Sequence, residues 1–265
     1  MHHLSSRAAR LAIVVVVLAA LAAPAALAAD RYVALGDSFS SGVGTGSYTL
    51  SSSCKRSVYA YPYLVSQQRP NTALTFVACS GAKTTDLMAN QIQSVTPDTA
   101  IVTVTIGGND IGFASLIQQC TLGECSAALD ATRNSLATTL NPKLDTVYAA
   151  IRAQVPFSAK VVVLGYPREF TSSSCIGTLG ISATERTKAN QLAEQLDQVI
   201  AARATDPAYA FTYQSALAPF QTHAVCSSSP WLNGLNLFNT TESYHPNRNG
   251  NSQGYLPLVR SALGF

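Results

Sequence analysis

The sequence predicts an α/β domain built on a parallel β-sheet. Five short apolar runs alternate along the chain with polar loops and helix-compatible segments, which is the pattern of parallel strands joined by helical crossovers. Residues 29–265 have a length that one compact domain commonly has, and they contain no internal repeat, linker or low-complexity block. We therefore expect a single domain over 29–265.

The first element is a leader at residues 1–28. Arg7 and Arg10 precede the apolar run 11–22, and residues 26–28 read Ala-Leu-Ala, a small-residue cleavage motif. This is the pattern of a secretory signal peptide. The apolar run is shorter than the ~20 residues that a membrane span needs, which disfavours a membrane anchor. We expect a secreted, extracellular protein with no stable membrane insertion.

The apolar runs that follow the leader predict five strands. They lie at 32–35, 74–78, 101–106, 160–165 and 210–213. Most are followed by a loop and then by a segment compatible with a helix, so we expect the strands to form one parallel sheet.

Two helices are predicted most clearly. The helix at 183–204 has one apolar stripe and either Ser182 or Thr184 as its cap. Its stripe consists of Ala189, Leu192, Leu196, Val199 and Ile200. The other helix covers 126–154, where Pro142 is expected to bend or interrupt it.

The charge content excludes some partners. Only 12% of the residues are charged, and removal of the leader takes away two basic residues and no acidic one. The remaining chain is almost neutral, and its basic residues form no patch that would suggest a nucleic-acid partner.

Six cysteines follow the leader, an even number that favours disulfides in an exported protein. Six cysteines allow fifteen pairings, and sequential pairing leaves no crossed loops. We therefore expect the bridges Cys54–Cys79, Cys120–Cys125 and Cys175–Cys226. A structural zinc site is the alternative, but no C-x-x-C pair is present and no histidine lies beside a close cysteine pair. We expect no metal.

Chemistry-bearing residues follow the first three predicted strands. Ser38 follows Gly36-Asp37, Gly81 follows Cys79-Ser80, and Asn109 follows Gly107-Gly108. Because ligands bind beyond the carboxyl ends of parallel strands, these loops are expected to meet at one edge of the sheet. A serine with amide donors beside it fits ester hydrolysis, in which an oxyanion must be stabilised. Asp110 is expected to cap the helix that follows it.

The serine needs a base, and the chain beyond the leader offers two histidines, His223 and His245. His223 lies in a segment without a further motif and is expected to be structural. His245 follows Glu242 by three residues, so that carboxylate could orient its ring. We expect activity to fall below an apparent pKa near the unperturbed ~6.5 of histidine.

Taken together, the Gly-Asp-Ser, Ser-Gly, Gly-Gly-Asn-Asp and His-Pro blocks resemble the four signature blocks of the SGNH (GDSL) hydrolase family. The resemblance spans nearly all of the chain beyond the leader and is greatest to secreted actinobacterial lipases and esterases with three disulfides, which supports the sequential pairing. It implies a three-layer α/β/α, flavodoxin-like fold with a central five-stranded parallel sheet.

The resemblance also implies roles for single residues. Ser38 corresponds to the nucleophile and His245 to the general base, while the N–H groups of Ser38 and Gly81 and the side chain of Asn109 correspond to the oxyanion hole. Glu242 stands where the family usually has Asp. Two arrangements therefore remain open: a triad with Glu242, or a Ser-His dyad whose histidine is oriented by a backbone carbonyl, for example from the segment 229–231.

The function expected from these residues is that of a secreted serine ester hydrolase acting on acyl lipids, as a monomer and without a cofactor. Carbohydrate deacetylation is an alternative that the same catalytic set performs elsewhere in the family. A non-catalytic binding module is disfavoured because it would have no need of all four groups. Val43, Ile111 and Phe113 are expected to line the acyl pocket.

Overall fold

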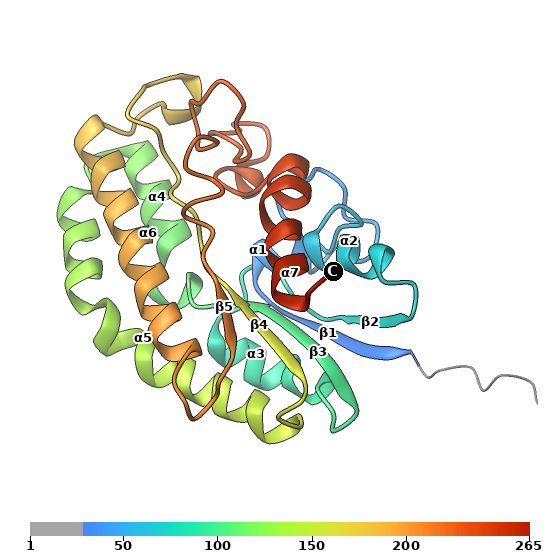
Figure 1. Ribbon diagram of the computed structural model, residues 1–265. Coiled ribbons are helices and arrows are strands. Elements are labelled where there is room, and N and C mark those ends of the chain that lie inside the picture. Colours follow the sequence, from blue (N-terminus) through green and yellow to red (C-terminus); the bar gives the residue numbers. More distant parts are fainter. Residues whose placement is uncertain (1–28) are drawn as a thin grey trace, which may run out of the picture.

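In a computed structural model of the protein, residues 29–265 form an α/β domain around one five-stranded sheet (Figure 1). The predicted signal peptide, residues 1–28, lies outside the residues that the structure describes. All strand pairs are parallel, and the strand order is β2-β1-β3-β4-β5. The five predicted parallel strands and the layered fold are confirmed.

The strands are apolar because both faces of the sheet are covered. β1 and β3 are almost completely buried along their length. The strands are β1 (Asp30–Gly36), β2 (Thr72–Phe76), β3 (Thr99–Thr105), β4 (Lys160–Leu164) and β5 (Thr212–Gln214). β5 begins two residues later than predicted, because Ala210 adopts a left-handed turn conformation, with φ 52°, after α6.

Helices cover the sheet on both faces (Figure 1). One layer contains α1, α2 and α7, and the other contains α3, α4, α5 and α6. Their bounds are α1 (Ser38–Ser41), α2 (Tyr61–Gln68), α3 (Thr84–Asn90), α4 (Phe113–Leu122), α5 (Ser126–Gln154), α6 (Ala183–Ala204) and α7 (Leu256–Leu263). Short 3-10 turns are η1 (Ile92–Ser94), η2 (Asn109–Ile111), η3 (Ile176–Thr178) and η4 (Thr240–Glu242), and η5 (Gly250–Tyr255) is a π-helical turn.

α6 has the predicted bounds, and its cap is Ser182 rather than Thr184. The Ser182 hydroxyl accepts from the Glu185 N–H at 3.2 Å, and the Glu185 carboxylate accepts from the Ser182 N–H at 2.8 Å. This reciprocal pair is a capping box. Four of the five predicted stripe residues are buried, and Val199 is partly buried.

α5 is continuous through Pro142, so the predicted interruption does not occur. Figure 1 shows the helix curving along its length, as expected where proline removes one backbone donor and crowds the preceding turn. The buried side chains of the helix, among them Leu140 and Leu144, hold it against the sheet. Within residues 29–265, no helix has both the length and the apolar character needed to cross a membrane.

Candidate active site

Ser38 lies at the carboxyl end of β1, in the first turn of α1. The Asp37 side chain caps this turn by accepting the Phe39 N–H at 3.0 Å. Gly36 has a φ of 124°, and a Cβ at this position would lie 2.4 Å from the Thr105 carbonyl oxygen. Only glycine therefore allows β1 to turn into the helix while packed against β3, and the turn presents Ser38 at the edge of the sheet.

His245 contacts the Ser38 hydroxyl directly. The distance from His245 Nε2 to Ser38 Oγ is 2.8 Å, and the distance from His245 Nδ1 to the Ser243 carbonyl oxygen is 2.9 Å. Because a carbonyl can only accept, Nδ1 carries the proton and Nε2 is left to accept from the serine. Ser38 and His245 thus form a hydrogen-bonded pair with the geometry that a nucleophile and its base require.

The conformation of Tyr244 makes the contact to the Ser243 carbonyl possible. Tyr244 has a φ of 59°, in the left-handed region that non-glycine residues rarely adopt. This turn brings the carbonyl of residue 243 back to the ring of residue 245. The Tyr244 N–H donates to the Asn233 carbonyl at 3.0 Å, and the Asn233 N–H donates to the His245 carbonyl at 2.9 Å, which holds the turn in place.

Glu242 does not reach His245, which argues against the expected Ser-His-Glu triad. Its Oε1 accepts from the Tyr48 hydroxyl at 2.7 Å and from the Asn239 amide at 3.2 Å. The carboxylate thus joins the loop after α1 to the histidine loop. A backbone carbonyl contacts the His245 ring instead, as in the second arrangement that the sequence left open. This carbonyl belongs to Ser243 and not to the segment 229–231.

The loop after α1 also positions the histidine loop by close packing. A Cβ on Gly44 would lie 2.6 Å from the Pro246 carbonyl oxygen and 3.0 Å from the His245 Cβ. Gly44 has a φ of 96°, so both its conformation and its surroundings require glycine. The Asn233 amide donates to the Gly44 carbonyl at 2.9 Å and links the two loops.

Gly81 and Asn109 line the same cavity as Ser38 and His245. Within residues 29–265, neither the Ser38 N–H nor the Gly81 N–H has a hydrogen-bond acceptor. The Asn109 amide donates one hydrogen to the Ala82 carbonyl at 3.1 Å and carries a second hydrogen. The residues that carry these three donors thus line one cavity, and donors gathered at such a place are what stabilises an oxyanion.

Asp110 ties the second and third loops together. It accepts from the Thr84 N–H at 2.9 Å and from the Thr84 hydroxyl at 2.7 Å. Asp110 therefore caps α3 from a distant loop and does not cap the helix that follows it, contrary to the expectation. Lys143 Nζ lies 3.5 Å from the same carboxylate. These contacts fix the Gly81 loop relative to the Asn109 loop.

Burial shifts the pKa of two groups in the site. It lowers the pKa of His245 to about 4, with the Ser243 carbonyl opposing the shift. We therefore expect the acidic limb of activity to lie below the unperturbed value near ~6.5. Burial also raises the pKa of Asp37 to about 7, against the opposing hydrogen bonds from Tyr166 and the Phe39 N–H.

Two side chains near the nucleophile were not predicted from the sequence. The Tyr166 hydroxyl donates to Asp37 and accepts from the Gly108 N–H at 3.1 Å, which links three loops. Its position directly after the fourth predicted strand is a signal that could have identified it. Glu169 lines the cavity and is 1% exposed, and among the described residues its Oε2 has no hydrogen-bond partner.

The cavity has a volume of about 500 Å³ and is mostly apolar. Phe113 lines it as expected, while Val43 and Ile111 are not among the lining residues. Val43, in the loop after α1, is fully buried instead. Ile117, Leu196 and Leu235 are further apolar residues in the wall, so the space beside Ser38 suits an acyl chain.

His223 has the structural role that was predicted. Its Nδ1 contacts the Ser229 carbonyl oxygen at 2.7 Å, and its ring stacks on Trp231 with centroids 3.7 Å apart. The segment 229–231 therefore serves this histidine and not His245. This leaves His245 as the histidine at Ser38.

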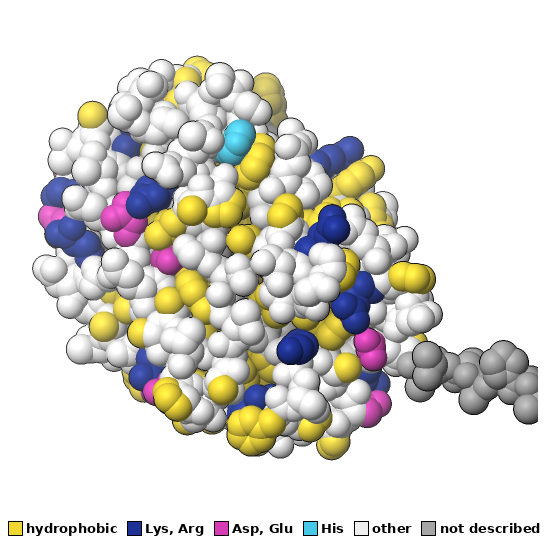
Figure 2. Space-filling model, viewed as in Figure 1, with side chains coloured by type: hydrophobic (Ala, Val, Ile, Leu, Met, Phe, Trp, Pro, Cys, Tyr) yellow, Lys and Arg dark blue, Asp and Glu magenta, His cyan; other side chains and the backbone are white. Residues whose placement is uncertain are grey.

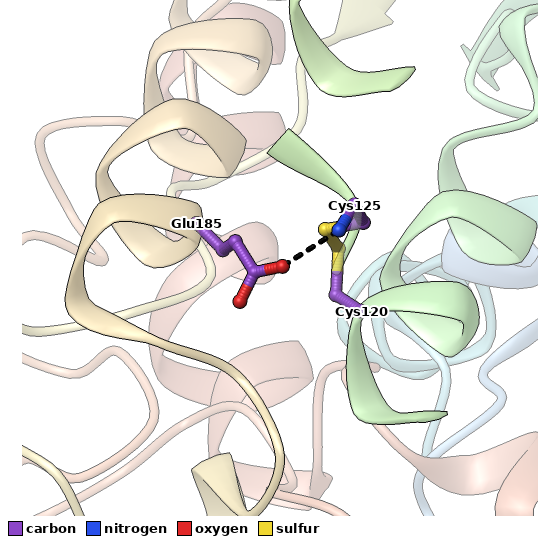
Figure 3. A group of neighbouring side chains, drawn as sticks. All are labelled: Cys120, Cys125 and Glu185. Atoms are coloured by element: carbon purple, nitrogen blue, oxygen red, sulfur yellow. Dashed lines mark hydrogen bonds between the residues drawn. A yellow bond between two sulfur atoms is a disulfide. The ribbon is translucent and has the colours of Figure 1, made fainter. Parts of the chain in front are cut away.

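One group of potential metal ligands occurs among residues 29–265, namely Cys120, Cys125 and Glu185 (Figure 3). The two sulfur atoms are joined in a disulfide and offer no thiolate. The Glu185 carboxylate accepts from the Cys125 N–H at 2.8 Å, as the dashed line shows. These groups fit a structural brace between α4, α5 and α6 better than a metal site.

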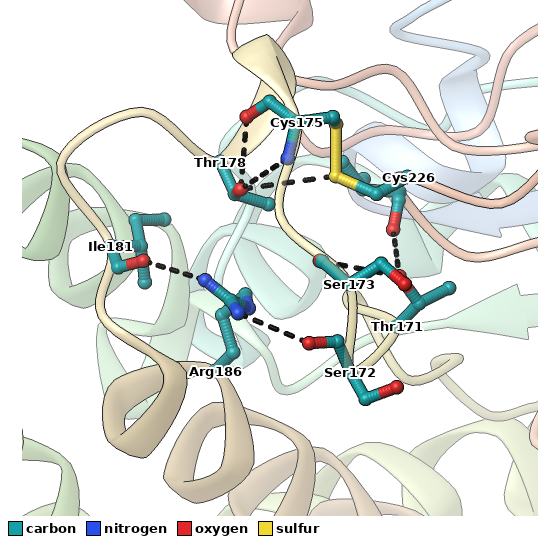
Figure 4. Close-up of a disulfide and its surroundings, with 9 residues drawn as sticks. Thr171, Ser172, Ser173, Cys175, Thr178, Ile181, Arg186 and Cys226 are labelled. Atoms are coloured by element: carbon teal, nitrogen blue, oxygen red, sulfur yellow. Dashed lines mark hydrogen bonds between the residues drawn. A yellow bond between two sulfur atoms is a disulfide. The ribbon is translucent and has the colours of Figure 1, made fainter.

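The structure contains disulfides between the expected cysteine pairs, 54–79, 120–125 and 175–226. Cys79 directly precedes Ser80-Gly81, and the Ser80 N–H donates to the Cys54 carbonyl at 3.0 Å. Cys175 directly precedes η3, and Figure 4 shows its disulfide to Cys226 beside Thr178. The first bridge thus holds the Gly81 loop.

A model of the GDSL-like Lipase/Acylhydrolase family matches residues 34–253. Among curated proteins, Lipase 1 of Streptomyces coelicolor is 45% identical over 240 residues, covering 89% of this chain and 87% of that protein. The Lipase of Streptomyces rimosus is 45% identical over 239 residues, covering 88% and 87%.

Two solved structures of similar proteins have the same fold. The extracellular lipase from Streptomyces rimosus superposes with a TM-score of 0.83 at 45% identity, covering 88% of this chain and all of that one. Phospholipase A1 from Streptomyces albidoflavus NA297 also superposes with a TM-score of 0.83, at 41% identity, covering 89% of this chain and all of that one.

Proposed function

The chain belongs to the GDSL-like lipase/acylhydrolase family and is a carboxylic ester hydrolase, and from this we propose that it cleaves acyl esters of lipids with a Ser38–His245 dyad. The observation that carries the assignment of the dyad is the 2.8 Å contact between Ser38 Oγ and His245 Nε2. Nucleophile and base within this reach are the mark of covalent catalysis by serine.

In the acylation step, Ser38 Oγ attacks the ester carbonyl carbon while His245 Nε2 takes its proton. The carbonyl oxygen becomes negative and is held by the N–H groups of Ser38 and Gly81 and by the Asn109 amide. Collapse of this intermediate breaks the bond to the alcohol, which leaves with the proton from His245. The acyl group is then bound to Ser38.

Water completes the reaction. His245 Nε2 removes a proton from a water molecule that attacks the acyl-serine, and the same three donors hold the second oxyanion. Release of the acid returns the proton to Ser38 Oγ. The Ser243 carbonyl accepts from Nδ1–H throughout, so it fixes the tautomer and helps to stabilise the imidazolium that forms in each step.

A lipid acyl group is the substrate that the cavity supports best. Apolar side chains dominate its wall, and it is large enough for a chain longer than acetyl. The two Streptomyces relatives carry the name lipase, and one similar structure is a phospholipase A1. No feature of the site favours carbohydrate deacetylation.

The proposal includes secretion and a monomeric state. The three disulfides are of the kind that persists in oxidising compartments, and the leader has the pattern of a cleaved signal. The protein is expected in the culture medium with Ala29 as its first residue, and at the mass of one chain in sedimentation. A protein that keeps its leader, or that stays in the cell, would contradict secretion.

The test of the chemistry is Ser38→Ala together with labelling by an organophosphate. The variant should lose ester hydrolysis and keep its melting temperature, because the hydroxyl is small and its loss leaves no large cavity. The label should attach to Ser38 in the wild type and to nothing in the variant. Labelling of Ser80, Ser115 or Ser243, the other serines in this wall, would contradict the assignment.

The test of substrate class is a panel of p-nitrophenyl esters of increasing chain length, followed by triacylglycerol, phospholipid and acetylated xylan. Esters of medium and long acyl chains should have the higher kcat/KM. A clear preference for acetyl esters of carbohydrate would contradict the lipid assignment and leave the serine mechanism intact.

A further inference from the structure

Large apolar side chains gather at the mouth of the cavity and are exposed to solvent. We use the term rim for Leu122, Ile176, Leu179, Leu237 and Phe238. Within residues 29–265, seven large apolar side chains are exposed to solvent, and five of them belong to the rim. Leu122, Leu179 and Leu237 also line the cavity, so the rim begins where the cavity opens.

The three segments that form the rim contact one another. A Cβ on Gly180 would lie 2.4 Å from the Thr121 carbonyl oxygen, which places Leu179 beside Leu122. The Leu235 N–H donates to the Gly177 carbonyl at 2.9 Å, which joins η3 to the segment that carries Leu237 and Phe238. The rim is therefore one continuous surface. Contiguous exposed apolar surface of this kind marks an interaction site.

Disulfides and buried hydrogen bonds hold the rim in place. Leu122 lies within the short loop closed by Cys120–Cys125, and Ile176 follows Cys175 of the Cys175–Cys226 bridge. Figure 4 shows the buried Arg186 donating to the carbonyls of Ile181 and Ser172, which lie after and before Cys175 in the chain, at 2.9 and 3.2 Å. The fold thus keeps these side chains exposed instead of letting the loops fold them inward.

The segments around the rim contain no Lys, Arg, Asp or Glu. This holds for residues 111–123, 170–184 and 207–241, which together supply the whole rim. The uppermost part of the molecule in Figure 2, above the sheet, is correspondingly white and yellow, while charged side chains lie lower and at the sides. A surface without cations cannot attract anionic headgroups, so its affinity must come from apolar burial.

We propose that the rim inserts into a lipid surface with zwitterionic or neutral headgroups and so places the cavity mouth against the acyl esters. This inference builds on the proposed lipid hydrolysis. Exposed Leu, Ile and Phe side chains gain by leaving water for the acyl boundary of the headgroup layer. Binding should be nearly insensitive to salt, because no charge pairs contribute.

The test uses Ile176→Ser/Phe238→Ser, a double variant of two rim residues that do not line the cavity. Phe157→Ser is the matched control. Phe157 is 78% exposed and precedes β4, at the end of the sheet opposite the site. All proteins carry Ser38→Ala so that they bind without hydrolysis. Partition is measured by co-sedimentation with phosphatidylcholine vesicles at low and high NaCl.

The protein with the unchanged rim and the Phe157→Ser control should bind the vesicles equally at both salt concentrations. The double variant should bind the vesicles at least about tenfold more weakly. Equal binding by the double variant, equal loss in Phe157→Ser, or a requirement for anionic lipid would each overturn the proposal. So would a dimer that dissociates in the double variant without vesicle binding, because the rim would then join two copies of this chain.

Hydrolysis of a water-soluble p-nitrophenyl ester separates this inference from the proposed function. With Ser38 present, the double variant should keep the wild-type kcat/KM on this substrate, because neither residue lines the cavity. Loss of vesicle binding with unchanged turnover supports the rim. A wild-type protein that hydrolyses no ester would instead contradict the proposed function, whatever its vesicle binding.

Discussion

His245 is oriented by a backbone carbonyl two residues earlier in the chain. The contact from Nδ1 to the Ser243 carbonyl depends on the left-handed conformation of Tyr244, whereas Glu242 bonds to Tyr48 and Asn239. A carbonyl can fix the tautomer as a carboxylate does, although it contributes no negative charge. We therefore expect His245 to act as the base without an acidic partner.

Glu242→Gln should lower kcat by less than about tenfold. Glutamine keeps an oxygen that can accept from Tyr48, and the His245 tautomer does not depend on it. In a true triad, loss of the carboxylate costs on the order of 10⁴. Steady-state kinetics distinguish the two cases, with Tyr48→Phe as a second probe of the same contact and His245→Ala as the inactive reference. A loss near 10⁴ would establish a triad.

The pH profile should have its acidic limb well below neutrality. Burial lowers the pKa of His245 to about 4, and only the neutral imidazole can accept the Ser38 proton. The kcat/KM should therefore hold as pH falls through ~6.5 and decline only as pH approaches about 4. His223→Ala is the control and should have the same profile. A limb near ~6.5 would mean that water reaches the ring freely.

At the scale of elements, the site is assembled from the carboxyl ends of β1, β2, β3 and β4, where ligands bind in parallel sheets. Each strand supplies one loop, and hydrogen bonds between the loops set their spacing. The Tyr166 hydroxyl joins Asp37 to the Gly108 N–H, and Asp110 joins η2 to the start of α3. These bonds fix the loops that carry the proposed oxyanion donors before substrate arrives, which would avoid a cost of reorganisation.

Asn109→Ala should lower kcat by about 10²–10³ with little change in KM, the result expected for loss of one oxyanion donor. Asn109 also donates to the Ala82 carbonyl, so a purely structural role would instead reduce stability. The melting temperature of the variant separates the two explanations. An effect confined to KM would place Asn109 in substrate binding.

At the scale of the whole molecule, the domain buries the carboxyl group of Glu169. Burial raises the pKa of Glu169 well above its usual value, and its Oε2 has no hydrogen bond among the described residues. The group is therefore protonated in the folded state at pH values where the unfolded chain ionises it. The unfolded state then binds fewer protons, so stability falls as pH rises from about 4.3 towards the folded pKa.

Glu169→Gln should remove this pH dependence. Relative to wild type, the free energy of unfolding of the variant should rise by about 1.4 kcal/mol for each pH unit within that window, because glutamine does not ionise. Urea unfolding at pH 5, 6 and 7 measures the difference, and Glu124→Gln, at an exposed site, controls for the loss of one carboxyl group. A constant difference across these pH values would show that Glu169 is already ionised in the fold.

The sequence by itself determined the parallel sheet and the succession of its strands along the chain. It also identified four candidate site residues, namely Ser38, Gly81, Asn109 and His245. Strand runs and their following loops are local features, and parallel strands bring such loops to one edge whatever the side-chain detail. Sequential pairing of the cysteines followed from the absence of crossed loops, and the resemblance of four separate blocks to one family supported it. These inferences depend only on chain order and residue type.

Only the tertiary structure decided what orients His245, how the loops are braced and where the apolar rim lies. The Ser243 carbonyl turns to the ring because Tyr244 adopts a left-handed conformation that its residue type does not favour, so no local pattern signals it. Glu242 and Asp110 find partners far away in sequence, and the segment 229–231 contacts His223 and not His245. Such contacts depend on how the loops pack in three dimensions, and spacing along the chain does not encode that packing.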